Sequence, residues 1–236
     1  MRNQLLHGYV LHQRPYRENS RLVNFLSVEY GRVDGVARQH LPPLYQSALL
    51  YASGKSGLKS FSKSEQTGPV HILQGQALLA GFYLNELLVR LLPIEEQCTE
   101  LVAAYGIAVE GLSQLAIQSD PHRALIAILR RFEWVLLQAL GYAVVFDRDE
   151  LDAPIEPDVY YRYHAGAGFC RSGQGESGAT LLRLADPSQM FLPEHLASLT
   201  RIFKRELALQ LGDQPLKSRE LWLAGRPNET NSFFVG

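Results

Sequence analysis

The sequence predicts an α+β protein with a small closed β-barrel in its first third, followed by a mainly helical part that contains a small β-hairpin. Three observations lead to this prediction. Short β-rich runs separated by Gly and Pro fill residues 1–75. The apolar pattern then takes a helical period, and one aromatic run, YYRYHAGAGF, interrupts it with a glycine-rich turn. We therefore expect two domains, residues 1–75 and residues 76–236, with the hairpin near residues 159–172.

The first domain is expected to hold five or so short strands. The runs are YVLHQRPY, RLVNFLSVEYGRVDGVAR, LYQSALLY, GLKSFS and PVHIL, and Tyr30 and Gly31 mark a tight turn within the second. A closed barrel suits strands this short better than an open sheet does, because closure removes the exposed edges.

The second domain is expected to begin with two helices. The run GQALLAGFYLNELLVRLL carries a wide apolar stripe at helical spacing, and Pro93 ends it. A second helical stretch follows at about residues 97–117. At the far end of the chain, NETNSFFVG predicts a loose tail.

Two further helices have clear start and stop signals. For the third helix, Asp120 can cap the first turn, Pro121 suits the first helical position and Gly141 suits the exit. The last long helix is expected over residues 193–211, with Gly212 as its C-cap.

The composition is that of a globular protein. The chain has 236 residues, of which 46% are apolar and 20% charged. No apolar run approaches the roughly 18 residues of a membrane span, and the first residues lack the pattern of a secretory signal. The two cysteines do not suggest a disulfide framework. A cytoplasmic protein that does not contact the membrane is the natural expectation.

The charge is unevenly distributed along the chain. Residues 1–75 contain nine Lys or Arg and four Asp or Glu, a net charge of +5. The remainder contains 14 basic and 20 acidic residues, a net charge of −6. A basic first third followed by an acidic remainder suggests two domains with different partners.

The sequence offers little catalytic chemistry. SGKSG around Lys55 resembles part of a phosphate-binding loop, but the motif requires glycine where this chain has Leu49. Cys98 and Cys170 form no Cys-x-x-Cys pair, and no histidine has the spacing of a zinc ligand. We therefore expect neither an enzyme nor a metal or other cofactor.

The barrel region carries a signal for nucleic-acid binding. Small barrels with a basic groove and exposed rings bind single strands, since cations meet phosphates and rings stack on bases. Two of the rings, Tyr9 and Phe25, could equally be barrel core. The residues concerned are Arg14, Arg17, Arg21, Arg32 and Arg38, which lie near Tyr9, Tyr16, Phe25 and Tyr30.

The helices carry a second signal. Two basic pairs, Arg130-Arg131 and Lys204-Arg205, interrupt apolar helical runs, so one member of each pair must lie nearer the buried face. A cation beside an apolar groove suits a ligand with a hydrophobic end and negative charges. An intramolecular ion pair with Glu133 or Glu206 is the equally weighted alternative. Near the C-terminus, PLKSREL adds Lys217 and Arg219 beside an apolar segment.

Taken together, the chain resembles the RecO family of bacterial recombination mediators over nearly its whole length. The resemblance rests on the order and spacing of LHQRPYRENSRLVNFLSVEYGRV, FYLNELLVRLL, LRRFEWVLLQALGY and LGDQPLKSREL. It implies an N-terminal OB-fold barrel followed by a helical domain. It also implies binding of single-stranded and possibly double-stranded DNA, annealing of complementary strands, and work with RecR to replace single-strand-binding protein (SSB) by RecA. Such a protein would be cytoplasmic and associated with the nucleoid.

The resemblance also suggests which cations hold the acidic, phenylalanine-ended tail of SSB. Arg130 is the expected carboxylate partner, and Arg131, Lys204, Lys217 and Arg219 are its expected neighbours.

Two departures from the family pattern affect these expectations. The four cysteines that hold zinc in many RecO-like proteins are absent, so no zinc is expected. The segment VARQHLPPLYQ, which is usually rich in Lys and Arg, keeps only Arg38. Lys55, Lys59 and Lys63 could then supply DNA contacts. A protein-interaction adaptor that docks the SSB tail without binding DNA remains the alternative.

Overall fold

The computed structural model describes residues 1–38, 40–55 and 57–224, which form two compact units. The first unit comprises residues 1–117 and 216–222, and the second begins at residue 118 and includes residues up to 215. This division differs from the expected boundary at residue 75, because two helices group with the barrel. The expected domains, residues 1–75 and 76–236, stay a prediction, and the expected C-terminal tail lies outside the described residues.

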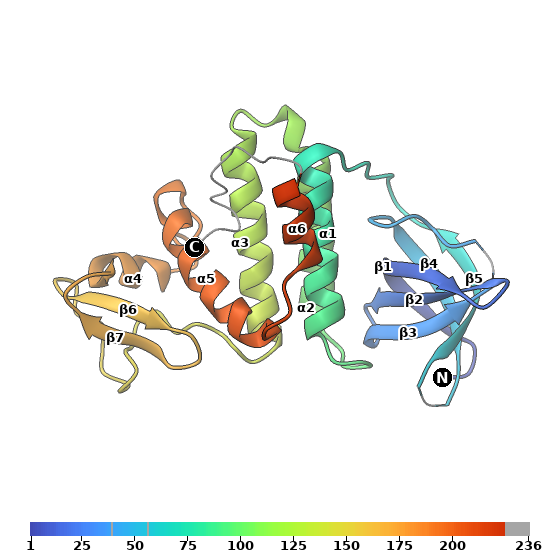
Figure 1. Ribbon diagram of the computed structural model, residues 1–236, viewed down its shortest axis with the longest axis horizontal. Helices are drawn as coiled ribbons and strands as arrows, with labels where there is room; N and C mark the ends of the chain where they lie inside the picture. The colour runs from blue at the N-terminus through green and yellow to red at the C-terminus, as the bar shows by residue number, and fades with distance from the viewer. Residues whose placement is uncertain (39, 56, 225–236) are drawn as a thin grey trace. The chain divides into compact units, whose positions relative to one another are not determined.

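The first unit is built on a closed five-stranded barrel (Figure 1). Its strands are β1 (Gln4–Tyr16), β2 (Ser20–Ser27), β3 (Gly31–Ala37), β4 (Ser47–Ser53) and β5 (Lys59–Gln66), in the order β1-β2-β3-β5-β4. All pairs are antiparallel except β3 with β5. The predicted fold class, an OB-like barrel followed by a mainly helical part with a small sheet, is confirmed.

Paired positions show how the barrel closes. Gln4 of β1 pairs with Ala52 of β4, which pairs with Phe61 of β5. Phe61 pairs with Ala37 of β3, Ala37 with Arg21 of β2, and Arg21 with Pro15, which lies on β1 again. The eleven-residue offset between Gln4 and Pro15 is the stagger that a tilted closed barrel requires. Its core holds fully buried side chains from every strand, and these are Leu6, Val10, Val23, Phe25, Val33, Ala37, Leu50, Ala52 and Phe61.

One predicted strand is wrong. PVHIL, residues 69–73, has no regular structure. Pro69 has no backbone N–H to give to a strand ladder, and the barrel is already closed by β5.

Helix α1 (Gly75–Leu91) and helix α2 (Thr99–Ser113) also belong to the first unit, and η1 (Leu115–Ile117) follows them. The pattern-based prediction of the first helix is confirmed, with Leu84, Leu87 and Leu88 fully buried. A β-bulge near Val10 turns the carbonyl of Leu11 away from the ladder, and Asn85 of α1 donates a 2.8 Å hydrogen bond to it. The barrel and α1 are therefore joined by a buried polar contact.

The segment PLKSREL forms the N-terminal turns of helix α6 (Lys217–Ala224), which the sequence did not predict. The carboxylate of Glu86 in α1 accepts hydrogen bonds from the backbone N–H groups of Lys217 (2.9 Å) and Ser218 (2.8 Å). A carboxylate at this end satisfies N–H groups that a helix leaves unpaired. Trp222 is only 1% exposed and anchors the helix, while Lys217 and Arg219 are exposed.

The second unit combines two long helices with a small sheet. Helix α3 (Pro121–Ala139) begins as predicted, since Asp120 accepts a 3.0 Å hydrogen bond from the N–H of Arg123. The last long helix is η2 (Pro193–His195) followed by α5 (Leu196–Leu211), and it ends at Gly212 as predicted.

The predicted hairpin in the second unit is β6 (Tyr160–His164) with β7 (Gly168–Ser172). Two elements were not predicted, the two-residue strand β8 (Glu176–Ser177) and helix α4 (Gly178–Leu184). The sheet order is β7-β6-β8. None of the helices in the described ranges is both long and apolar enough to cross a membrane.

Candidate nucleic-acid interface and peptide pocket

Five of the predicted DNA-contacting cations gather at one end of the barrel. Around this end, Pro15 pairs with Arg21, Arg21 with Ala37, and Ala37 with Phe61. The side chain of Arg21 lies on the same face of β2 as the core residue Val23, beyond the end of the core, and donates a 3.1 Å hydrogen bond to Gln13. The exposed cations of this barrel end are Arg14, Arg17, Arg21, Arg38 and Lys63.

The other three predicted cations lie elsewhere. Arg32 pairs with Asp34 at 2.7 Å and donates to the carbonyls of Val89 and Leu92 at the end of α1. Lys59 is 2% exposed, and its Nζ lies 2.5 Å from Glu95. Both side chains are therefore occupied in holding the barrel to the end of α1 and to the segment that follows it, which counts against direct contacts with DNA.

Lys55 is exposed, but it lies in the β4–β5 loop. The carbonyl of its neighbour Gly54 accepts a hydrogen bond from the amino group of Met1. This loop is remote in register from the barrel end that holds Lys63, since it lies on the other side of Phe61 along β5.

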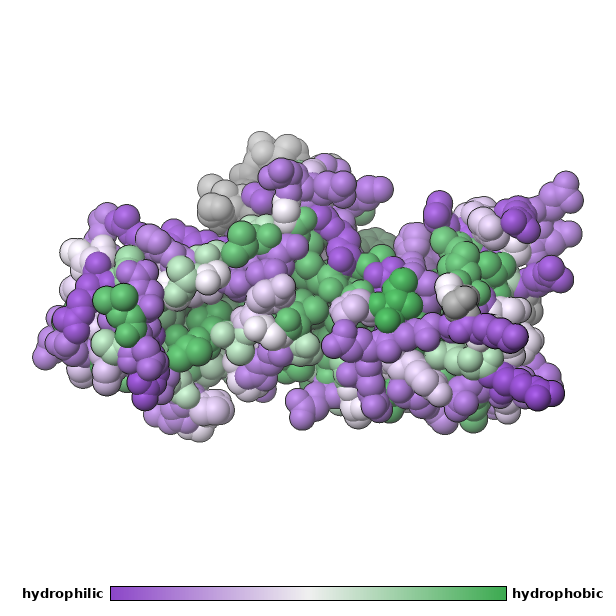
Figure 2. All heavy atoms as spheres, turned by 90° about the horizontal axis from the view of Figure 1, so that it is seen from below, coloured by the Kyte–Doolittle hydropathy of each residue, from purple (hydrophilic) through white to green (hydrophobic). Residues whose placement is uncertain are grey.

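Fewer of the barrel's aromatic rings are exposed for base stacking than the sequence suggested. Phe25 is fully buried in the barrel core, and Tyr9 packs edge-on against Tyr105 with a centroid distance of 5.0 Å. The alternative that the ring is barrel core is therefore correct for Phe25, whereas Tyr9 is half-buried and packs on α2 rather than in the barrel core. Tyr16 remains at the barrel end, with the guanidinium of Arg17 over its ring at 5.1 Å. In Figure 2, hydrophilic side chains surround separate apolar patches on the barrel, at the right of the view.

Arg130 takes the intramolecular alternative. It is 2% exposed, and its Nη2 lies 2.5 Å from Oε1 of Glu133, which is fully buried. Its Nε and Nη1 are buried without a hydrogen-bond partner in the described part of the chain. Burial counts against Arg130 as a surface contact for a peptide carboxylate. Arg131 is exposed, and its guanidinium lies over the ring of Phe191 at 5.1 Å.

A pocket of about 620 Å³ lies between the start of α3 and one face of α5, and we call it the α3–α5 pocket. Its apolar lining comes from Ile126, Leu196 and Ala208, among others. Cations from both helices, Arg123 and Lys204 among them, line it as well. Apolar floor and basic side chains together suit a ligand with a hydrophobic end and a carboxylate.

The five predicted tail-binding residues are divided between the two units, and their role stays a prediction. Only Lys204 lines the α3–α5 pocket, whereas Lys217 and Arg219 belong to α6 in the first unit. Sequence reasoning missed Arg123 and Arg201, which also line this pocket. The spacing of three to four residues between Ala197, Arg201, Lys204 and Ala208 along α5 was the available signal.

The structure also bears on metal binding. Within residues 1–38, 40–55 and 57–224, no group of three or more His, Cys, Asp or Glu side chains could hold a metal ion. Cys170 and His164 do approach each other, with Sγ and Nε2 3.4 Å apart.

An OB-like closed barrel with a cationic end and a helical part with a pocket are features typical of a binding protein. Two family models match the chain, "Recombination protein O N terminal" over residues 1–69 and "Recombination protein O C terminal" over residues 73–220. The chain belongs to the RecO family.

Named relatives agree with this assignment. The DNA repair protein RecO of Stutzerimonas stutzeri is 38% identical and covers 92% of this chain and 92% of its own length. The DNA repair protein RecO of Nitrosospira multiformis is 39% identical, covering 91% of this chain and 92% of its own length. A role in recombinational DNA repair follows from the family.

Proposed function

We propose that this chain is a non-enzymatic recombination mediator. It binds single-stranded DNA through the barrel, anneals complementary strands, and works with RecR to load RecA onto DNA coated with SSB. Double-stranded DNA is a further candidate ligand. The function is one of competing binding equilibria, in which no covalent bond is made or broken.

The observation that carries this proposal is the cluster of five exposed cations at one barrel end. Within the described residues, no ion pair joins any of the five to an acidic side chain, so their charge remains available to phosphates. Arg14, Arg17 and Arg21 lie on or beside a single hairpin, while Arg38 and Lys63 come from neighbouring strands. Phosphate contacts of this kind carry no base preference, as annealing of arbitrary complementary strands requires.

A titration of labelled single-stranded DNA, followed by fluorescence anisotropy between about 50 and 200 mM salt, tests the proposal. The unaltered chain is expected to bind with an affinity that falls steeply with salt. The double variant Arg14→Glu/Arg17→Glu should lose about 30- to 100-fold at the lower salt concentration, since each reversal removes a phosphate contact and adds repulsion. Arg183→Glu, an exposed residue of α4, is the control for a charge reversal elsewhere. Salt-independent binding, or equal loss in the control, would contradict the proposal.

The α3–α5 pocket favours a second function, docking of the acidic SSB tail. A peptide with aspartates before a C-terminal phenylalanine matches the apolar floor and the basic side chains. This activity is compatible with the mediator function, but it would also serve an adaptor that does not bind DNA.

Different variants distinguish DNA binding from binding of the SSB tail. Lys204→Gln should weaken binding of a labelled tail peptide about 5- to 10-fold, the effect of one lost charge-assisted hydrogen bond, and leave DNA binding within about twofold. Arg14→Glu/Arg17→Glu should do the reverse. Peptide binding without DNA binding in the unaltered chain would establish the adaptor and exclude the mediator.

A further inference from the structure

We propose that a second pocket of the second unit is an additional contact for single-stranded DNA, in which Arg162, Arg201 and Arg205 bind backbone phosphates. The proposal rests on the proposed DNA-binding function and adds a site outside the barrel. We call it the arginine pocket.

The arginine pocket has a volume of about 470 Å³ and lies where β8 ends beside β6. Strand β8 pairs only with Tyr160 and Tyr161, so the following residues of β6 have no partner strand on that side. One wall is β6 itself, another is the β7–β8 connection with Gln174 and Gly175, and the third is α5. The site is thus formed by two neighbouring segments of the small sheet and by α5, which comes later in the chain.

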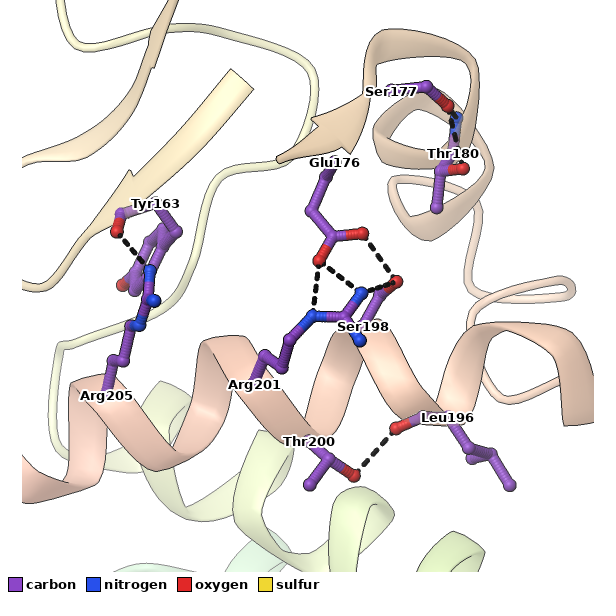
Figure 3. A network of polar contacts seen from close by, with 9 residues as sticks. All are labelled: Tyr163, Glu176, Ser177, Thr180, Leu196, Ser198, Thr200, Arg201 and Arg205. Carbon is purple, nitrogen blue, oxygen red and sulfur yellow. Dashed lines mark hydrogen bonds and ion pairs between the residues drawn. The ribbon is translucent and has the colours of Figure 1, made fainter. Parts of the chain in front are cut away.

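Two of the three arginines are held in place by hydrogen bonds (Figure 3). Arg201 donates from Nε and Nη2 to Oε1 of Glu176, at 2.9 and 2.6 Å, and Nη2 also reaches Ser198 at 3.1 Å. Arg205 donates from Nη1 to the backbone carbonyl of Tyr163 at 3.0 Å. Nη1 of Arg201, and Nε and Nη2 of Arg205, make no hydrogen bond among the described residues. A guanidinium fixed at one edge keeps its remaining donors oriented for a ligand.

The support beneath these arginines is buried and specific. Glu206 of α5 accepts hydrogen bonds from the Tyr163 hydroxyl (2.6 Å) and the Gly166 N–H (2.9 Å), which fixes β6 on α5. Gly175 has a φ of 135°, and a Cβ there would collide with the carbonyl of Tyr161. Only glycine allows this close approach, which brings Glu176 into reach of Arg201.

The charge of the pocket favours an anion. Three arginines and one carboxylate line the pocket. The carboxylate is Glu176, whose side chain is 11% exposed and already engaged by Arg201 and Ser198. The side chain of Arg162 is exposed and forms no hydrogen bond or ion pair within the described part of the chain. A net charge of two positives with free guanidinium donors matches phosphodiesters, which arginine binds in a bidentate manner.

A neighbouring ring selects single-stranded nucleic acid over an acidic peptide. Tyr160 is 51% exposed and lies two residues from Arg162 on β6, so both side chains project from the same face of the strand. A cation for the backbone beside a ring for a base is the combination that binds single strands without sequence preference. The mostly polar lining gives an acidic peptide with an apolar end little to bury.

The test measures the affinity of three single variants of the full chain for a labelled oligothymidine, across the same salt range. Arg162→Gln should weaken binding about fivefold at low salt and lower the slope of log affinity against log salt by about 0.7, the value for one phosphate contact on a single strand. Tyr160→Ala should weaken binding about fivefold at every salt concentration without changing the slope, because stacking releases no counterions. Arg183→Gln, which removes an equal charge from exposed α4, should remain within about twofold of the unaltered chain in affinity.

Each alternative outcome overturns the inference in a distinct way. If Arg162→Gln behaves like Arg183→Gln while Arg14→Glu/Arg17→Glu still loses DNA, the arginine pocket is not a DNA site and the proposed function stands. If Arg162→Gln weakens an acidic tail peptide but not oligothymidine, the pocket binds peptide. If the unaltered chain shows no salt-dependent DNA binding, the proposed function fails and this inference fails with it.

Discussion

The barrel and the α3–α5 region use basic side chains in two different ways. In the barrel, cations divide into two separate sets: Arg32 and Lys59 are fixed by internal partners, whereas cations such as Arg14 and Arg38 project into solvent. In the α3–α5 region, one side chain can be both fixed and available to a ligand. Arg201 is held by Glu176 and also lines the α3–α5 pocket and the arginine pocket. Loosely held cations suit a flexible polyanion, while oriented ones suit a ligand of defined shape.

The largest expected effect concerns the most deeply buried pair, Arg130 with Glu133. Glu133→Ala should lower the free energy of unfolding by about 3–5 kcal/mol, because it leaves a buried guanidinium without its carboxylate. Urea denaturation with a constant m-value measures the change.

A double variant sharpens this result. Arg130→Met/Glu133→Leu removes both charges and should recover most of the lost stability, since apolar replacement of a whole buried pair is often neutral. If Glu133→Ala costs less than about 1 kcal/mol, Arg130 has another acceptor and its role in ligand binding reopens.

The second prediction tests the separation within the barrel. Arg32→Ala should lower the free energy of unfolding by about 2–3 kcal/mol, because Asp34 and two carbonyls at the end of α1 lose their donor. Arg14→Ala, an exposed residue of the same barrel, should stay within about 0.5 kcal/mol. Urea denaturation of both variants measures the difference, and equal effects would erase the distinction between fixed and exposed cations.

The sequence predicted the barrel better than it predicted the pockets. Strand alternation and the change of period at Gly75 are local signals, and Asp120 and Gly212 mark helix ends through backbone chemistry that depends on neighbours in the chain. The pockets depend on which helix faces meet. Nothing local distinguishes Lys59, paired with Glu95 thirty-six residues later, from the exposed Lys63.

The same limit applies to helix α6. Its first turn is capped by Glu86, 131 residues earlier in the chain, so no signal within PLKSREL predicts a helix start. The pair Arg130-Arg131, in contrast, was correctly expected to place one cation toward the interior, because adjacent residues on a helix must diverge. Arg130 is buried and Arg131 is exposed.

The third prediction concerns the support of the arginine pocket. Burial, and then the hydrogen bond to Glu206 and its negative charge, raise the pKa of Tyr163. A phenol whose pKa is higher in the folded state contributes stability that is fully present below the unfolded value of about 10 and is lost as the pH rises above it. Tyr163→Phe should cost about 1–1.5 kcal/mol near neutral pH, from the lost hydrogen bond to a carboxylate.

The pH profile distinguishes this contact from simple packing. Between about pH 9 and 11, the unaltered chain should lose more stability than Tyr163→Phe, and the two urea curves should converge. A constant difference across this range would mean that Tyr163 does not remain protonated in the folded state, and the hydrogen bond to Glu206 would not be its main contribution.

The smallest expected change in stability comes from Glu176, the residue that holds Arg201 in the arginine pocket. Glu176→Gln keeps acceptors for Arg201 and Ser198 but removes the charge, so the free energy of unfolding should fall by only about 0.5–1 kcal/mol.

If Arg201 is both fixed and functional, single-stranded DNA should bind about twofold more tightly to Glu176→Gln, because the arginine pocket gains one net positive charge. Anisotropy titration at low salt measures this gain. Gln174→Glu, two residues earlier in the same pocket lining, adds a negative charge and should shift the affinity in the opposite direction. A loss of affinity in Glu176→Gln would show instead that orientation of Arg201 by its carboxylate outweighs the charge that the carboxylate cancels.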